Sequence, residues 1–147
     1  MRRQPCARSA ARARSSSIER IVVDASAVVE LLLGGGRARA VRRVIGGAVP
    51  AAPDLLNAEV ISAFRRFEAT GAVEQRRARD AILRLAEAPI ERLTTAHLSL
   101  EVWHRRHNLT SYDATYLALA AALDCPLLTA DTGIARSPRP GVPVIGL

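Results

Sequence analysis

Residues 21–33 read IVVDASAVVELLL, a short apolar run followed by a helical pattern. The β-branched run at 21–23 is too short for a helix and is typical of a buried strand in a parallel sheet. It stops at Asp24, and residues 26–33 then predict a helix that the glycines at 34–36 end. This segment therefore indicates a strand that passes directly into a helix, as parallel α/β domains require.

The same alternation continues through the rest of the chain. Its patterns predict helices at residues 37–45, 54–69, 74–88, 95–106 and 111–123, and strands at 48–52, 126–129 and 142–145, with no element assigned to 90–93. Asp54 is the expected N-cap of the helix that starts there. Because helices separate the strands, we expect one domain over residues 18–147, a three-layer α/β/α sandwich with a central, mainly parallel sheet.

The composition is that of a globular protein whose basic residues are all arginine. With 147 residues, 49% hydrophobic and 24% charged, the chain fits a single domain with a real core. The absence of lysine excludes P-loop, Schiff-base, pyridoxal and Ser–Lys chemistry. Cys6 and Cys125 cannot build a disulfide framework, which favours a reducing, cytoplasmic location. No apolar run approaches the ~20 residues of a membrane span.

The net charge of +7 is concentrated in residues 1–17. This Arg/Ser-rich segment holds five arginines and no acid, so the remaining residues carry 16 arginines against 14 acids. It has no periodic apolar pattern, and we expect a disordered N-terminal extension. A solvated tail, a mis-assigned start, a basic arm that binds RNA and a transit peptide all stay open.

Four carboxylates occupy positions where acids are unusual. Asp24 follows an apolar strand directly, and Asp131 follows the strand-like run LLTA at 127–130. Asp113 lies in the first turn of a predicted helix, on its apolar stripe, and Glu59 lies among apolar neighbours in the middle of another. A carboxylate on an apolar face is costly unless something pairs with it. These four residues are therefore the candidate site residues.

Each of the four also has a purely structural explanation. Asp24 and Asp131 could be helix N-caps, and Asp113 could complete a capping box with Thr110. Glu59 could pair with a nearby arginine, either Arg65 or Arg66, although neither is placed on its face of the helix.

Taken together, the four acids indicate a metal-dependent site. Functional sites of open parallel sheets lie beyond the carboxyl ends of the strands, where two of these acids follow strands directly. Clustered carboxylates cannot all ionise unless a cation neutralises them, and oxygen ligands select Mg²⁺ or Mn²⁺. Such a site is suited to the attack of a metal-activated water on a phosphodiester.

The segments that contain these acids also resemble those of a known family. They are IVVDAS at 21–26, PDLLNAE at 53–59, SYDATYLALA at 111–120 and LLTAD at 127–131. In order and spacing they resemble the four acidic motifs of PIN-domain ribonucleases, and most closely those of VapC-type toxins from bacterial toxin–antitoxin pairs. The resemblance covers about residues 20–147. The segment 132–141 lacks the usual apolar helix of that family, which suggests a loop.

The resemblance implies a function and a set of residue roles. Asp24 and Asp113 would be the metal-coordinating pair, Glu59 and Asp131 would complete the acidic pocket, and Ser26 would hydrogen-bond to it. The activity implied is that of an Mg²⁺- or Mn²⁺-dependent endoribonuclease acting on structured RNA such as tRNA or rRNA. The partners implied are a second copy of the chain and a cognate VapB-type antitoxin whose tail occupies the pocket.

Aromatic residues make up only 3% of the chain, so we expect RNA to be recognised through its backbone and shape. Arginines that could contact phosphates, or could equally be solvated surface, stand at positions 37, 39, 42, 43, 105 and 106.

Three other functions compete with the nuclease. His97, Glu101, His104 and His107 have a spacing that could hold zinc, although a polar surface helix explains it as well. A haloacid-dehalogenase-type phosphatase needs a second aspartate where Ser26 stands, and it also needs a lysine. The third alternative is a catalytically silent PIN-fold module that binds RNA or protein, and the presence of all four acids argues against it.

Overall fold

The computed structural model describes residues 19–136 and 141–147, so the extension predicted at residues 1–17 lies outside the described residues. The strands are β1 Arg20–Val23, β2 Val49–Pro53, β3 Glu91–Leu93, β4 Leu127–Thr129 and β5 Val144–Gly146. The helices are α1 Ala25–Leu33, α2 Gly36–Ile45, α3 Leu56–Ala69, α4 Gln75–Glu87, α5 Ser99–His104, α6 Ser111–Ala122 and α7 Thr132–Arg136, with a 3₁₀ turn at Ala96–Leu98.

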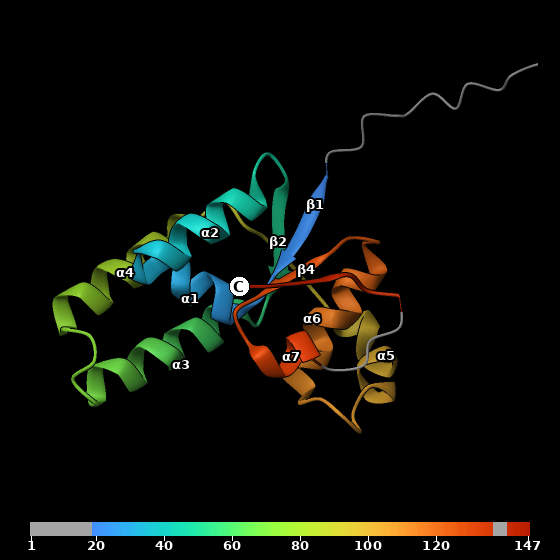
Figure 1. The fold of residues 1–147 in the computed structure, drawn as a ribbon. Helices are drawn as coiled ribbons and strands as arrows, with labels where there is room; N and C mark the ends of the chain where they lie inside the picture. The colour runs from blue at the N-terminus through green and yellow to red at the C-terminus, as the bar shows by residue number, and fades with distance from the viewer. Residues whose placement is uncertain (1–18, 137–140) are drawn as a thin grey trace, which may run out of the picture.

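The described strands form one parallel sheet in the order β3-β2-β1-β4-β5. Helices α1 to α4 lie on one side of the strands, and α5 and α6 lie on the other, with α7 beside β4 and β5 (Figure 1). This arrangement confirms the predicted three-layer α/β/α sandwich. The chain leaves β1 in one direction toward β2 and returns on its other side as β4, so the carboxyl ends of β1 and β4 form the switch point where α/β sheets bind ligands.

The core is formed by the apolar runs that the sequence places in the strands and in α6. Ile21, Val22 and Val23 of β1 are buried, as are all residues of α6 from 114 to 120. The small alanines of α6 let this helix contact β1, β2 and β4. Because α6 packs on these strands, its first turn lies next to the carboxyl ends of the central strands.

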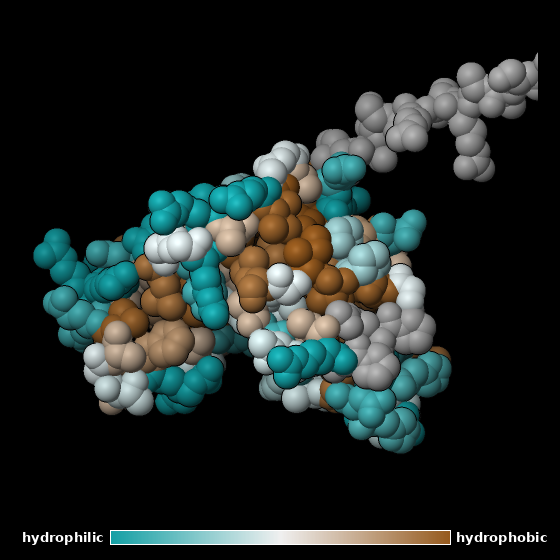
Figure 2. All heavy atoms as spheres, in the orientation of Figure 1, coloured by the Kyte–Doolittle hydropathy of each residue, from teal (hydrophilic) through white to brown (hydrophobic). Residues whose placement is uncertain are grey.

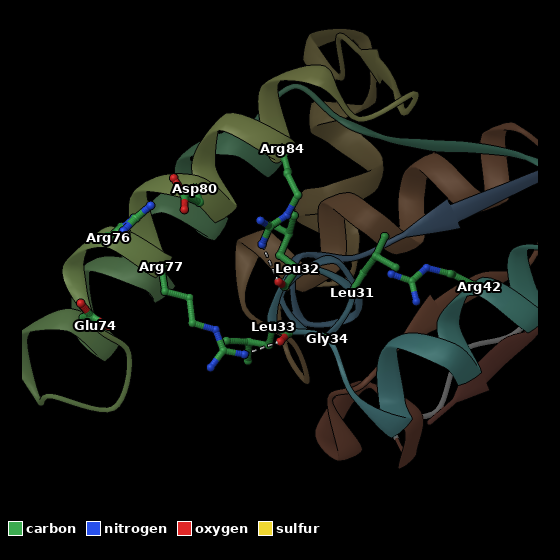
Figure 3. A pocket seen from close by; sticks show the side chains of 10 residues that line it. All are labelled: Leu31, Leu32, Leu33, Gly34, Arg42, Glu74, Arg76, Arg77, Asp80 and Arg84. Atoms are coloured by element: carbon green, nitrogen blue, oxygen red, sulfur yellow. Dashed lines mark hydrogen bonds between the residues drawn. The ribbon is translucent and has the colours of Figure 1, made fainter.

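The arginine-rich helix α4 supports the far end of α1. Arg84 Nη2 donates to the carbonyl oxygen of Leu32 at 3.0 Å, and Arg77 Nη2 donates to that of Leu33 at 2.8 Å. Figure 3 shows both guanidinium groups reaching from α4 to the last turn of α1. These carbonyls have no partner within their own helix, and the cationic donors also suit the negative end of its dipole.

Apolar side chains of α3 and α4 line a groove between the two helices. Ile61 is 46% exposed and Leu83 is 51% exposed, and both line this groove with Phe64 and Ile82. Hydrophilic side chains cover much of α2 and α4 on the face drawn in Figure 2. Among the described residues, no helix is both long enough and apolar enough to cross a membrane.

The structure differs from the sequence predictions in several elements. Asp54 is not an N-cap: α3 begins after Leu55 without a side-chain cap, and the backbone N–H of Asp54 instead donates to the carbonyl oxygen of Leu93. The predicted helix at 95–106 divides into the 3₁₀ turn and α5. The loop expected after Asp131 begins with a helix, α7, because the aspartate caps it.

Candidate active site

Asp24 lies at the junction between β1 and α1, with only 3% of its surface exposed. Its Oδ1 accepts hydrogen bonds from the backbone N–H of Ala27 at 2.9 Å and from the hydroxyl of Ser26 at 2.6 Å. Its Oδ2 accepts a hydrogen bond from the hydroxyl of Thr129 at 2.5 Å. The N-cap explanation is confirmed, and the cap itself holds the carboxylate at the carboxyl edge of the sheet.

Two hydroxyl groups join the end of β1 to the end of β4. Ser26 Oγ accepts a hydrogen bond from the backbone N–H of Ala130, and Thr129 Oγ1 accepts one from that of Asp131, both at 2.9 Å. Since both hydroxyls also donate to Asp24, they fix this carboxylate relative to β4. Thr129 was not among the predicted site residues. The signal that could have found it is a hydroxyl at the end of an otherwise apolar strand.

Asp131 caps the short helix α7 at the same edge. Its Oδ1 accepts hydrogen bonds from the backbone N–H groups of Gly133 at 2.6 Å and Ile134 at 3.2 Å. A Cβ atom at position 133 would lie only 2.9 Å from this Oδ1, so any other residue there would displace the carboxylate from its capping position. The side chain of Asp131 is thus held by its cap but remains exposed to solvent.

Asp113 and Thr110 form a capping pair at the start of α6. The Thr110 hydroxyl accepts a hydrogen bond from the backbone N–H of Asp113 at 3.2 Å and donates to its Oδ2 at 2.7 Å. The Asp113 carboxylate accepts from the Thr110 hydroxyl. In an ordinary capping box the corresponding side chain accepts from the backbone N–H of the N-cap residue instead. The pairing predicted from the sequence is therefore present in this form, and Asp113 is half-buried.

Glu59 is held by a tyrosine and not by an arginine. The hydroxyl of Tyr116, a buried residue of α6, donates to Glu59 Oε2 at 2.6 Å. Burial raises the pKa of Tyr116, and its hydrogen bond to Glu59 raises it further, so the hydroxyl stays protonated and remains a donor. Among the described residues neither Arg65 nor Arg66 lies within ion-pair distance of Glu59. The alternative that Glu59 pairs with one of these arginines is therefore wrong.

The acids lie close enough to influence one another. Burial raises the pKa of Asp24. The hydrogen bonds that Asp24 accepts lower this pKa, and the negative charge of Asp131 raises it. Burial also raises the pKa of Glu59, with smaller contributions from the charges of Asp113 and Asp24. Asp113 and Asp131 line one hollow of about 500 Å³. The carboxyl edge therefore carries a shared negative field centred on Asp24 and Glu59.

The described residues fit a hydrated divalent ion better than a closed metal cage. Within the described part of the chain, no three His, Cys, Asp or Glu side chains stand close enough to bind one ion together. Asp24 has about four lone-pair positions, of which three accept hydrogen bonds, so its Oδ2 keeps one for another ligand. Because Mg²⁺ is commonly held by one or two carboxylates and several waters, this remaining position on Asp24 suits such an ion.

The alternative zinc site is not formed. His97 lies in the 3₁₀ turn, and no cluster of zinc ligands forms within the described residues. Glu101 Oε1 instead accepts a hydrogen bond from Arg105 Nε at 3.1 Å along α5. His107 lies in the hollow beside Asp113 and Asp131, so it borders the acidic edge.

Comparison with known proteins shows the family of this chain. The family model of the PIN domain matches residues 21–140. Ribonuclease VapC1 of Mycobacterium tuberculosis is 41% identical over 123 residues, which cover 82% of this chain and 92% of that protein.

Two solved structures share the fold. The crystal structure of VapBC2 from Rickettsia felis, bound to a DNA fragment from its promoter, has a TM-score of 0.60 at 11% identity and covers 86% of this chain and 98% of that one. The structure of M. tuberculosis VapC20, described as a sarcin-ricin loop cleaving toxin, has a TM-score of 0.57 at 20% identity and covers 78% and 92%. This chain therefore belongs to the PIN-domain family, among the VapC ribonucleases.

Proposed function

We propose that this chain is an Mg²⁺- or Mn²⁺-dependent endoribonuclease and the toxin of a type II toxin–antitoxin pair. The observation that carries the proposal is the buried carboxylate of Asp24 at the switch point of the sheet. It shares its negative field with other acids, and no cationic side chain of the described residues lies within ion-pair distance of it. A fold that keeps a buried charge in this state is poised to bind a cation.

Each acid has a proposed role in the reaction. Asp24 and Asp113 hold the ion, and Glu59 and Asp131 complete the acidic pocket directly or through water. When bound, a divalent ion lowers the pKa of its water and neutralises charge on the attacked phosphate.

Neighbouring side chains hold these acids in position. Ser26 and Thr129 fix the orientation of Asp24, and Tyr116 fixes that of Glu59. Because these side chains are already held in place, binding the ion and its water costs them little further conformational entropy.

The substrate and partners follow from the same family. Structured RNA such as tRNA or rRNA is the proposed substrate, because the matched relatives are ribonucleases and a structural neighbour is described as cleaving the sarcin-ricin loop. A cognate VapB-type antitoxin is the proposed partner, since a structural neighbour is a VapBC complex. The apolar groove between α3 and α4 offers a surface for such a partner. We also propose a homodimer that acts in the cytoplasm.

The domain boundary is part of the proposal. Residues 18–147 form the nuclease domain, and residues 1–17 are an extension outside it. A catalytically silent module of the same fold is the alternative, and the four acids, held by the contacts described above, argue against it.

The decisive experiment compares two Asp→Asn variants of the purified protein on tRNA and ribosomal RNA. With Mg²⁺ or Mn²⁺ the wild-type protein is expected to cut RNA, and EDTA or Asp113→Asn is expected to stop it. Asp124→Asn is the matched control, because Asp124 lies before β4 at the opposite edge of the sheet and has a φ of 49° that asparagine also tolerates. Cleavage that persists in EDTA, or that both variants lose equally, would overturn the proposal.

A further inference from the structure

Tyr112 differs from the other aromatic residues of the chain. It stands in the first turn of α6, is 59% exposed, and its side chain has no hydrogen bond or ring contact with any described residue. The other four are the edge-to-face pair Phe64–Phe67, Tyr116 bonded to Glu59, and Trp103 beneath the guanidinium of Arg106. A single exposed ring is ordinary on a protein surface, so its position decides whether it has a function.

A hollow of about 380 Å³ lies beside Tyr112, where the first turn of α6 faces α3. It is lined by Leu55, Ala58, Glu59, Ser62, Arg66 and Tyr112. The lining positions on α3 recur every three or four residues and therefore form one stripe along the helix. The volume is near the lower end of the roughly 300–1,000 Å³ typical of ligand sites, so it suits one nucleobase and not a duplex.

The hollow borders the acidic edge through Glu59. Glu59 lines it and also shares the negative field of Asp113 and Asp24. Tyr112 directly precedes Asp113 in the chain. Whatever occupies the hollow therefore lies next to the groups that would hold the ion and the reacting phosphate.

The charges along the hollow determine how a bound nucleotide would be oriented. Arg66 is exposed, and its guanidinium has no hydrogen bond or ion pair with the described residues. It lies two helical turns from Glu59, about 10 Å along α3. Since the glutamate repels a phosphate and the arginine attracts one, a nucleotide would place its uncharged base beside Tyr112 and its outer phosphate toward Arg66.

From this arrangement we infer that Tyr112 stacks on one unpaired base of the substrate RNA, next to the phosphodiester that is cleaved. Arg66 contacts the phosphate on the outer side of that base. The inference rests on the proposed nuclease function and adds a specificity-determining contact to it. It also revises the expectation that RNA is read through backbone and shape alone, because the ring is placed where single-stranded bases are stacked by aromatic side chains.

The test pairs variants of Tyr112 with changes in the RNA. The cut positions in tRNA and ribosomal RNA are first mapped by sequencing the ends that the wild-type protein leaves. Hairpins spanning one cut are then made with an ordinary nucleotide or an abasic one at each position flanking the cut. For wild type, one abasic position is expected to raise KM by about 5- to 150-fold, the range of base–aromatic stacking, with a much smaller change in kcat.

The variants decide whether Tyr112 is responsible. Tyr112→Ala is expected to raise KM by the same factor and to become indifferent to the abasic position, whereas Tyr112→Phe keeps the ring and retains wild-type behaviour. Arg66→Gln is expected to make KM less sensitive to salt. Leu100→Ala, a change at a 67% exposed residue of α5 away from the hollow, is the control expected to match wild type.

Failure of this inference is distinct from failure of the proposed function. If the wild-type protein cuts no RNA with Mg²⁺ or Mn²⁺, the proposed function is wrong. If it cuts RNA but Tyr112→Ala keeps the wild-type KM and the same dependence on the abasic position, the stacking inference is wrong. A Tyr112→Ala protein with normal base dependence and an altered oligomeric mass would show that the ring contacts protein and would equally overturn it.

Discussion

The two ends of α1 both carry the charge that a helix dipole favours, but the two ends differ in how far that charge is buried. At the start, the carboxylate of Asp24 is buried and is held only by neutral donors. At the end, the guanidinium groups of Arg84 and Arg77 reach from α4 to the carbonyls of Leu32 and Leu33. The second arrangement leaves the cations partly solvated, whereas the first desolvates an anion without a counter-ion.

This difference separates a structural use of charge from a functional one. The arginines donate to carbonyls that would otherwise lack partners, so their bonds stabilise the fold as it stands. The aspartate also caps its helix, but asparagine or serine would cap as well without a buried charge. The cost of keeping a carboxylate there is understandable if the charge serves to bind a cation.

The largest expected effect comes from removing that charge alone. Asp24→Asn keeps the Oδ1 acceptor for the Ala27 N–H and the Ser26 hydroxyl, and its amide group can donate to the Thr129 oxygen in place of the bond that Oδ2 accepts from it. The variant is therefore expected to retain the fold, with a melting temperature in EDTA close to that of wild type. Its RNA cleavage is expected to fall by about 100-fold or more, because the ion loses its buried ligand. Cleavage assays and thermal melts of the same preparations check both expectations. A variant that melts far below wild type would make Asp24 a structural residue like the arginines.

The functional end of α1 was easier to predict from the sequence than its surroundings. Asp24 and Asp131 follow apolar runs, so the parallel topology alone places them at one edge. The pairing of Glu59 with Tyr116 joins positions 57 residues apart on two helices, and their separate apolar stripes do not show which polar atoms will meet. Thr129 was missed for a similar reason, because its role depends on the register between β1 and β4.

The weakly patterned elements were the ones predicted least well. Strand β3, with the sequence ERL, has no apolar alternation and forms because β2 supplies a pairing edge. Helix α7 is five residues long and is started by Asp131, so its short apolar pattern gives little signal. Local sequence could not predict elements that depend on a neighbouring strand or on a cap.

At the other end of α1 the expected effect is on stability and not on cleavage. Arg84→Ala removes a part-buried hydrogen bond from a charged donor and is expected to lower the free energy of unfolding by about 1–2 kcal/mol in urea titrations. Arg76→Ala is the matched control: Arg76 and Arg84 of α4 both line a hollow beside the end of α1, but the guanidinium of Arg76 has no hydrogen bond or ion pair with a described residue (Figure 3). RNA cleavage per folded molecule should match wild type in both variants. A loss of cleavage by Arg84→Ala at full folding would contradict the separation of the two ends.

The smallest expected effect is a pH dependence confined to the acidic end. Because the pKa of Asp24 is raised in the folded state, the folded protein keeps this proton after the unfolded chain has lost it, so stability falls as pH rises from about 4 toward the raised pKa. Glu59 contributes in the same direction. The net effect is small, since hydrogen bonds to both carboxylates oppose the burial that raises their pKa values.

Urea titrations across pH in EDTA measure this slope, and the Asp24→Asn variant is expected to show a shallower one. Millimolar Mg²⁺ should restore stability near neutral pH in the wild-type protein and have less effect in the variant, because the ion binds the ionised carboxylate of the folded state. Equal slopes in the two proteins, with the same response to Mg²⁺, would mean that the buried carboxylate carries no unmatched charge. The contrast between the two ends of α1 would then lose its basis.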